Sequence, residues 1–197
     1  MERLILARHG ESVFSERLLM NGDVAVAGAL TKRGEDEARE LGRALEEIEL
    51  DICVTSEFER ARQTADLALE GRDVPREVMY ELNDPRYGEY EGQALEAYRG
   101  WAADAASDVE APGGGESRRQ IVARYSLAFR ALARRSEPTT LAVCHSLPIA
   151  YALAAREGLP PGVRVPLVLH AHAYPLDRDE LRRAIDVLDG WLAAPTW

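Results

Sequence analysis

The chain has 197 residues and a formal net charge of −10, and 46% of its residues are hydrophobic and 29% are charged. The length fits one domain, 1–197, and the composition is ordinary for a globular protein. The acidic charge argues against nucleic acid as a partner, and no apolar run approaches the roughly 20 residues that span a bilayer.

The start of the chain lacks the pattern of a signal peptide, because the apolar run 4–7 is short and Arg8 and His9 follow at once. The two cysteines, Cys53 and Cys144, each lie in an apolar run that is typical of a buried strand. We expect both to be buried free thiols, which favours a cytoplasmic protein.

Apolar patterning predicts strands that alternate with helices along the chain. The expected strands are 4–7, 51–55, 78–80, 139–144 and one or two segments within 163–174. The expected helices are 31–48, 56–68, 94–106, 117–135, 148–156 and 178–193, the first two capped by Thr31 and Ser56. Residues 13–30 have no clear period and are expected to form a long loop that shapes substrate choice. This alternation predicts an α/β fold, a three-layer α/β/α sandwich with a mostly parallel central sheet.

Polar residues follow three of the predicted strands, namely Arg8 and His9, then Ser56 and Arg60, and finally His145 and Ser146. If the sheet is parallel here, the carboxyl ends of these strands lie along one edge, where ligands bind in α/β folds. Guanidinium groups suit the geometry of phosphate, and helix N-termini attract anions. One imidazole would then attack phosphorus while the other stabilises the transition state. The pattern therefore predicts a phosphate-handling site whose chemistry requires no metal ion.

Other hydrolase and phosphate-binding chemistries lack their motifs in this chain. A cysteine-based phosphatase needs an arginine six positions after its cysteine, and neither cysteine has one. There is no Gly-x-x-x-x-Gly-Lys phosphate loop and no Gly-x-Ser-x-Gly elbow. His170 and His172 would face the same side of a predicted strand, where a pair of surface or half-buried histidines is favoured over a metal site. We therefore predict neither a metal nor a cofactor.

The segment Arg8-His9-Gly10-Glu11-Ser12 resembles the signature of the histidine phosphatase superfamily, which includes cofactor-dependent phosphoglycerate mutases. Four further blocks resemble this family in the same order: 55–65, with Arg60 as the phosphate-binding arginine; 82–92, with the proton donor; 114–117; and 143–146, with the second histidine. One Arg-His-Gly is a weak signal, but five ordered blocks that cover most of the chain are a strong one. The resemblance implies a phosphoglycerate mutase-like fold, with a small cap-like insertion at about 83–116.

The resemblance implies catalytic roles for Arg8, His9, Arg60, Asp84 and His145. His9 would attack a phosphomonoester and become phosphohistidine, while the two arginines and the second histidine hold the phosphoryl oxygens. An acid would protonate the leaving alkoxide and then activate water. The family's usual donor is glutamate in a Leu-x-Glu pattern, where this chain has Asp84, which is one methylene shorter. Glu81 is the rival donor, but the Tyr-Gly and Glu-Gly pairs that follow favour Asp84.

Substrate contacts are expected from Ser15, Asn21, Gly22, Glu81 and Ser146. Ser15 lies in the stretch where family members often carry asparagine, and Ser146 stands where glycine is common. Arg118, Arg119 and Arg124 are either solvated helix residues or contacts for a second anionic group of the substrate.

The function that this sequence favours is metal-independent hydrolysis of a small phosphomonoester through a phosphohistidine. The alternatives are a phosphoglycerate mutase-type phosphotransferase and a non-catalytic protein that binds a phosphorylated ligand. The sequence predicts neither the physiological substrate nor the oligomeric state.

Overall fold

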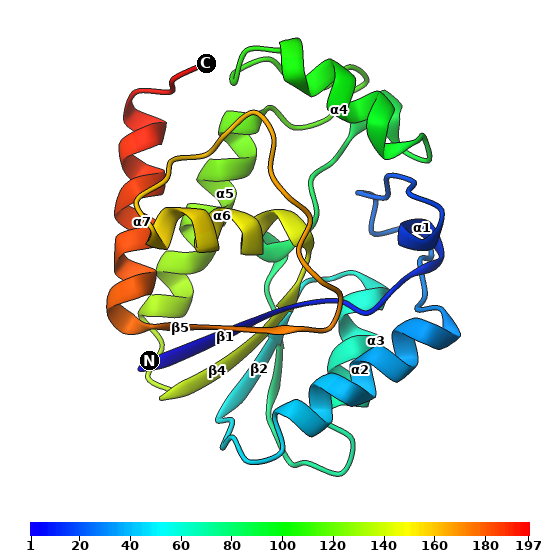
Figure 1. Cartoon of the computed structure of the whole chain (residues 1–197), viewed down its shortest axis with the longest axis vertical. Coiled ribbons are helices and arrows are strands. Elements are labelled where there is room, and N and C mark those ends of the chain that lie inside the picture. The colour runs from blue at the N-terminus through cyan, green and yellow to red at the C-terminus, as the bar shows by residue number, and fades with distance from the viewer.

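The computed structural model describes all 197 residues. Along the chain, strands alternate with helices (Figure 1). The strands are β1 (Arg3–Arg8), β2 (Ile52–Thr55), β3 (Arg76–Val78), β4 (Thr139–Cys144) and β5 (Ala173–Asp177). The helices are α1 (Val13–Glu16), α2 (Lys32–Ala44), α3 (Glu59–Ala68), α4 (Leu95–Asp104), α5 (Arg118–Ala133), α6 (Ser146–Arg156) and α7 (Arg178–Ala193), with the 3-10 turns η1 (Tyr80–Leu82) and η2 (Gly88–Tyr90). None of these helices combines the length and the apolar character that crossing a membrane requires.

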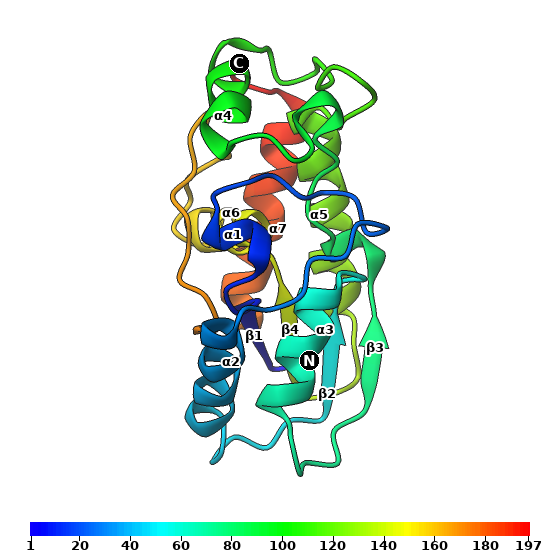
Figure 2. The same cartoon turned by 90° about the vertical axis from the view of Figure 1, so that its right-hand side faces the viewer.

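The five strands form one sheet in the order β3-β2-β4-β1-β5, and only β5 is antiparallel to its neighbour. Helices α2 and α3 cover one face, and α5, α6 and α7 cover the other (Figures 1 and 2). Alternate residues of β1 enter the two cores: Leu4 and Leu6 pack under α5 to α7, and Ile5 and Ala7 pack under α2 and α3. The predicted three-layer sandwich with a mostly parallel sheet is confirmed, and its first strand is buried on both faces.

The parallel strands β1, β4 and β2 end at the same edge of the sheet. In the strand register, their last residues lie within one position of one another. This alignment brings His9, Ser56 and His145 out side by side at the carboxyl edge, as the chain order predicts.

The structure corrects the predicted start of the helix that follows β2. Helix α3 begins at Glu59, with Phe58 in the N-cap position and no side-chain cap. The Ser56 hydroxyl lies 2.9 Å from Nε2 of His145 instead. The predicted cap is therefore wrong, because a residue at the end of the neighbouring strand bonds to the hydroxyl that the local pattern assigned to the helix.

The segment 163–172 does not form the predicted strand. Only β5, which begins at Ala173, joins the sheet, and it runs antiparallel to β1. Ala171 has a φ of 42°, a left-handed conformation that breaks an extended chain. The prediction that His170 and His172 share one face of a strand is therefore wrong.

Other boundaries also differ from the sequence prediction. The expected loop 13–30 contains the short helix α1, where Ser12 and Ser15 cap each other's backbone. The helix expected over 31–48 ends at Ala44, although Ile48 still packs on the core from the turn that follows. The strand expected at 78–80 lies at 76–78, and the chain then turns into η1.

Cys53 and Cys144 are buried and free, as the sequence predicts. Burial raises the pKa of each thiol to about 12. Both thiols therefore stay protonated at neutral pH and behave as small apolar side chains.

Two glycines allow the turn after β1 to pack directly on α2. A Cβ added at Gly10 would lie 2.3 Å from the Gly34 carbonyl oxygen, and one added at Gly34 would lie 2.0 Å from the Glu11 carbonyl oxygen. Both distances are far below van der Waals contact, so the two backbones touch where no side chain fits. This contact fixes the turn that carries His9 against the helix.

Replacing Gly34 with alanine is expected to lower the free energy of unfolding by about 1–3 kcal/mol, because the added methyl group overlaps backbone atoms. The matched control is Gly190→Ala in α7, where an added Cβ meets no atom within 4 Å. The control is expected to raise stability by about 0.5–1 kcal/mol through helix propensity. Urea denaturation measures both changes, and a Gly34→Ala protein as stable as the control would contradict the backbone contact.

Candidate active site

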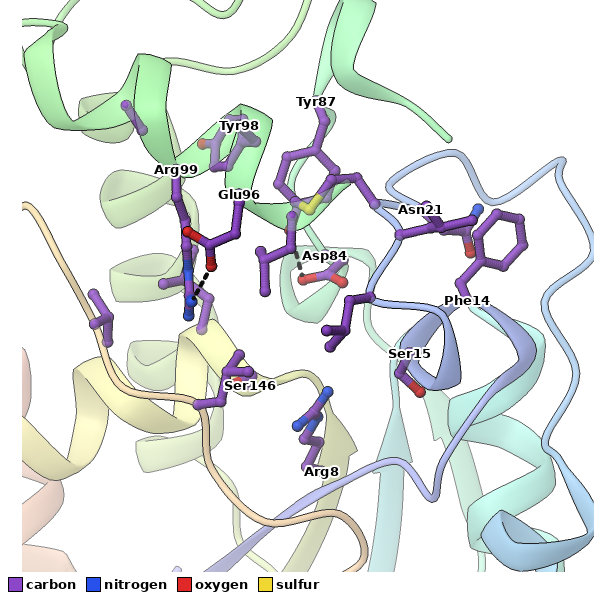
Figure 3. Close-up of a pocket in the computed structure, with 18 of the residues that line it drawn as sticks. Arg8, Phe14, Ser15, Asn21, Asp84, Tyr87, Glu96, Tyr98, Arg99 and Ser146 are labelled. Atoms are coloured by element: carbon purple, nitrogen blue, oxygen red, sulfur yellow. Dashed lines mark hydrogen bonds and ion pairs between the residues drawn. The ribbon is translucent and has the colours of Figure 1, made fainter. Parts of the chain in front are cut away.

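A cavity of about 590 Å³ opens at the carboxyl edge of the sheet (Figure 3). Its walls come from β1, α1 and the following loop, α4, the starts of α5 and α6, and residues 163–167. The predicted site residues that line it are Arg8, His9, Ser15, Asn21, Arg60, Asp84 and Ser146. His145 contacts this group from a fully buried position, whereas Gly22 and Glu81 do not line the cavity. The volume leaves space for much more than a phosphate group.

His9 is held in one tautomer at the floor of the cavity. Its Nδ1 lies 2.7 Å from the carbonyl oxygen of Gly10, and because that oxygen only accepts, Nδ1 carries the proton. Nε2 therefore presents its lone pair, which accepts a hydrogen bond from Nε of Arg60 at 3.1 Å. Burial, and then the charge of Arg60, lowers the pKa of His9 well below its usual value. A neutral imidazole with an available lone pair is the nucleophilic form.

Arg60 connects the other parts of the site. Its guanidinium donates to the side-chain oxygen of Asn21 at 2.5 Å and to the backbone oxygen of Asn21 at 3.0 Å. It also donates to Asp84 at 3.1 Å, and its Cζ lies 4.1 Å from the centre of the Phe58 ring. Only 3% of Arg60 is exposed. These contacts hold the guanidinium in place before any ligand arrives.

His145 lies on the other side of Arg60. Its Nδ1 accepts from Nη2 of Arg60 at 3.3 Å, so Nε2 carries the proton and donates to the Ser56 hydroxyl. Burial, and then the charge of Arg60, lowers the pKa of His145 well below its usual value. The ring centres of His9 and His145 are 5.2 Å apart, so one phosphoryl group can contact both.

Asp84 supplies the carboxyl group beside His145. Its Oδ2 accepts from Arg60 and lies 3.5 Å from Nδ1 of His145, while Oδ1 accepts from the Tyr87 hydroxyl at 3.3 Å. Burial raises the pKa of Asp84, although the charge of Arg60 opposes the shift. A raised pKa favours the protonated form that a general acid needs. Of the two donor candidates, only Asp84 lines the cavity, and Glu81 does not.

A buried ion pair holds the backbone next to Asp84. Arg124 and Glu116 form two hydrogen bonds, at 2.8 and 3.0 Å. Arg124 also donates to the carbonyl oxygens of Glu81 and Asn83 at 3.0 and 2.8 Å. Arg124 is thus neither a solvated residue nor an anion contact, the two possibilities that the sequence left open. It fixes the segment that carries Asp84.

Arg8 and Ser146 tie the segment 163–168 to the site. Nη1 of Arg8 donates to the carbonyl oxygen of Val168 at 2.8 Å, and the Val168 amide donates to the Ser146 hydroxyl at 3.1 Å. Nε of Arg8 is buried without a partner. Burial lowers the pKa of Arg8, but the guanidinium remains charged at neutral pH. An unpaired buried donor requires an acceptor, which a phosphate oxygen can supply.

The other predicted substrate contacts have partners within the protein. Ser15 lines the cavity, but its hydroxyl bonds to the backbone of Ser12 at the start of α1. Asn21 lines the cavity and orients Arg60 through both of its oxygens. The Gly22 amide donates to Glu91 at 2.8 Å, which fixes the loop after α1.

His170 is a residue of the site that the sequence analysis missed. Its ring centre lies 5.8 Å from that of His9, and its Nδ1 lies 3.9 Å from Glu37. Burial, and then the charges of Arg8 and Arg33, lowers the pKa of His170 to about 4. The His-x-His pattern was visible in the sequence. The antiparallel return of β5 along β1, which brings His170 beside His9, had no local signal.

Acidification is expected to destabilise the fold through three neutral histidines, of which His9 and His145 are buried and His170 is half-buried. The pKa values of His9, His145 and His170 are lowered in the folded protein, so each histidine binds a proton more readily in the unfolded chain. The free energy of unfolding therefore falls as the pH drops below about 6.5. A histidine with a folded-state pKa of about 4 contributes a loss of about 2 kcal/mol at pH 5.

Urea denaturation at pH 7 and pH 5 measures this loss, and His170→Gln is the informative variant. Glutamine does not titrate, so the variant is expected to lose less stability between the two pH values than the wild type. The raised pKa of Asp84 has the opposite effect, because it makes the folded protein more stable as the pH falls. Asp84 is present in both the wild type and the variant, so its contribution cancels when the two are compared. An equal pH dependence of the two proteins would show that His170 is not buried in its neutral form.

Relatives of this chain include both phosphatases and mutases. The adenosylcobalamin/alpha-ribazole phosphatase of Salmonella typhimurium is 36% identical over 121 residues, which are 57% of this chain and 59% of that protein. The phosphoglycerate mutase of Candida albicans is 40% identical over 107 residues, which are 50% of this chain and 42% of the mutase. These matches span about half the length of the curated relatives. The crystal structure of the alpha-ribazole phosphatase from Shigella flexneri has a TM-score of 0.74 and 26% identity, and the match covers 89% of this chain and 90% of that one.

The family is established by a match that covers most of the chain. The sequence profile of the histidine phosphatase superfamily (branch 1) matches residues 4–179. This range begins in β1, ends in the first turn of α7 and includes His9, Arg60 and His145. The chain therefore belongs to the histidine phosphatase superfamily, branch 1, as its five sequence blocks predict.

Proposed function

We propose that this protein hydrolyses phosphomonoesters through a phosphohistidine on His9 and needs no metal ion for the reaction. The observation that carries the proposal is the fixed tautomer of His9, with Nδ1 on the Gly10 carbonyl and Nε2 beside Arg60 at the floor of the cavity. Membership of the superfamily and the alpha-ribazole phosphatases among its relatives support the same reaction.

The phosphate group binds between two arginines. Arg8 offers an unpaired Nε, and the guanidinium of Arg60 is already oriented by Asn21. These two cations supply positive charge at the phosphoryl oxygens, the role that a divalent metal plays in other phosphatases. A bound dianion raises the pKa of His145, whose protonated ring then donates to a phosphoryl oxygen.

The reaction proceeds in two displacement steps. Nε2 of His9 attacks phosphorus and forms the N–P bond as the P–O bond to the leaving group breaks, and Asp84 donates its proton to the departing oxygen. The Nδ1 proton stays on the ring, where the Gly10 carbonyl stabilises it. Water then attacks phosphorus and gives its proton to Asp84 as the N–P bond breaks. Inorganic phosphate leaves, and both residues regain their starting protonation.

Two alternatives differ from this reaction in what happens to the phosphoryl group. A mutase would transfer it from His9 to a second hydroxyl group, and a binding protein would transfer nothing. We favour the phosphatase because the structural match to a phosphatase covers 89% of this chain and 90% of that one, whereas the sequence match to the mutase covers 50% of this chain and 42% of the mutase.

We also propose that residues 83–116 act as a cap over the cavity. Helix α4 lies beyond the carboxyl edge of the sheet (Figure 1). A small apolar cluster, separate from the two main cores, packs around it and consists of Met20, Tyr87, Tyr98, Ala102 and Ala111. Because this cluster is separate, substitutions in the cap can alter the shape of the cavity without disturbing the core of the sheet. The cap is therefore suited to determining substrate specificity.

The first test is phosphate release from 4-nitrophenyl phosphate, alpha-ribazole 5′-phosphate and 3-phosphoglycerate in the presence of EDTA. We expect the wild type to turn over at least one of them, and we expect His9→Ala to lose about a thousandfold or more of that activity. Activity that disappears with EDTA would point to a metal enzyme. An isomerised phosphoglycerate without free phosphate would point to a mutase.

The second test separates the two candidate acids. In single-turnover experiments Asp84→Asn is expected to slow release of glycerol from glycerol 3-phosphate by about 10²- to 10⁴-fold, because the alkoxide needs a proton. Release of 4-nitrophenolate is expected to slow much less, because this anion leaves without one. Glu81→Gln is the matched control and is expected to change neither rate. If Glu81→Gln shows the dependence on leaving group instead, Glu81 is the donor.

A further inference from the structure

The end of the cavity away from His9 contains a second set of cations. Five arginines line the cavity against two carboxylates. Two of the arginines and Asp84 form the phosphate end, which leaves Arg99, Arg118 and Arg164 without a role in the proposed reaction. Such a concentration of cations stands out in a chain whose net charge is −10.

Arg118 is the half-buried cation at this end that has no ionic partner. Arg99 pairs with Glu96 at 3.0 Å along α4 (Figure 3), and Arg164 is exposed at the rim. Nη1 of Arg118 donates to the hydroxyl of Tyr151 at 2.9 Å, and no carboxylate lies within ion-pair distance of Arg118. Because Tyr151 is buried in α6, it holds the guanidinium in a fixed place.

The position of Arg118 places it across the cavity from the phosphate end. Arg118 is the first residue of α5 and lines the cavity together with Tyr98. Tyr98 belongs to α4, and Figure 3 shows it on the side of the cavity opposite Arg8. The walls that join the two ends are largely apolar and include Phe14, Met20 and Leu147.

Arg118 is half-buried and has no carboxylate partner, and none of its nitrogen atoms is a buried donor without a partner, so its remaining donors are open to the cavity. The other nitrogen donors of Arg118 have no acceptor within the protein. A planar guanidinium with free donors matches the two oxygens of a carboxylate or a phosphate.

We propose that the substrate is a phosphomonoester whose apolar body carries a second anionic group, and that Arg118 binds this group. The phosphate lies between Arg8 and Arg60, the apolar body fills the space under α4, and a carboxylate or second phosphate reaches Arg118. The inference rests on the proposed function, because it takes the Arg8 and Arg60 end as the position of the reacting phosphate. A ligand with one anionic group would leave Arg118 without a partner.

The test measures binding of phosphonates that cannot be hydrolysed. Three ligands share a phenyl ring with a phosphonomethyl group, and at the opposite end they carry a propanoate, its methyl ester or an ethylphosphonate. Isothermal titration calorimetry of the wild type is expected to show about tenfold or more tighter binding of at least one doubly anionic ligand than of the ester. The tighter of the two identifies the second group as carboxylate or phosphate. Equal affinities for all three ligands would overturn the inference.

Two variants of Arg118 in α5 test whether this side chain causes the preference for a doubly anionic ligand over the ester. Arg118→Gln is expected to abolish the preference for the anionic ligand and to leave the affinity for the ester unchanged, whereas Arg118→Lys retains part of the preference. The matched control is Arg119→Gln, because Arg119 is exposed, bonds to the Leu192 carbonyl and does not line the cavity. A preference that survives Arg118→Gln would contradict the assignment.

The outcomes separate this inference from the proposed function. If phosphate release depends on His9 but the ester and the anionic ligands bind equally, only the inference fails. If a preference that depends on Arg118 appears in a protein that releases no phosphate, the second anion site stands and the phosphatase proposal fails.

Discussion

The buried guanidinium of Arg60 is the group on which the rest of the site depends. It bonds at once to His9, His145, Asn21 and Asp84. These partners follow two different strands and belong to two different loops, while Arg60 itself comes from α3. A charge with 3% exposure is tolerated only when its donors find acceptors. The sheet, the loops and α3 must therefore all be in place before the site exists, and the site in turn ties them together.

The sequence predicted those features that local patterns specify. An apolar run before Arg8 and another before His145 define strands buried on two faces, and a parallel sheet places the residues that follow them together. Strand β4 and helix α7 have the predicted bounds, 139–144 and 178–193, because apolar residues fill their buried faces without interruption. The prediction failed where a distant partner overrode a local preference. Ser56 has the pattern of a helix cap, but it bonds to His145 across the sheet edge.

The partners of a buried polar group have no comparable signal in the sequence. Arg124 reaches carbonyl groups that lie 41 and 43 residues earlier in the chain, and no periodicity encodes such a contact. Asn21 appeared as a substrate contact, but in the structure it orients Arg60. His170 reaches His9 only because β5 returns antiparallel beside β1. Sequence patterns thus locate the reacting groups, and tertiary contacts decide which residues hold them.

The placement of charge in this molecule also affects how fast a ligand arrives. The five arginines of the cavity lie in a chain whose net charge is −10, so the remainder of the surface is strongly acidic. A dianion in solution is repelled at long range and attracted only once it has entered the cavity. Salt screens charges that are more than about 8–10 Å apart and has much less effect on buried contacts. Higher ionic strength is therefore expected to speed the capture of substrate, the reverse of the behaviour of proteins that steer anions along a basic surface.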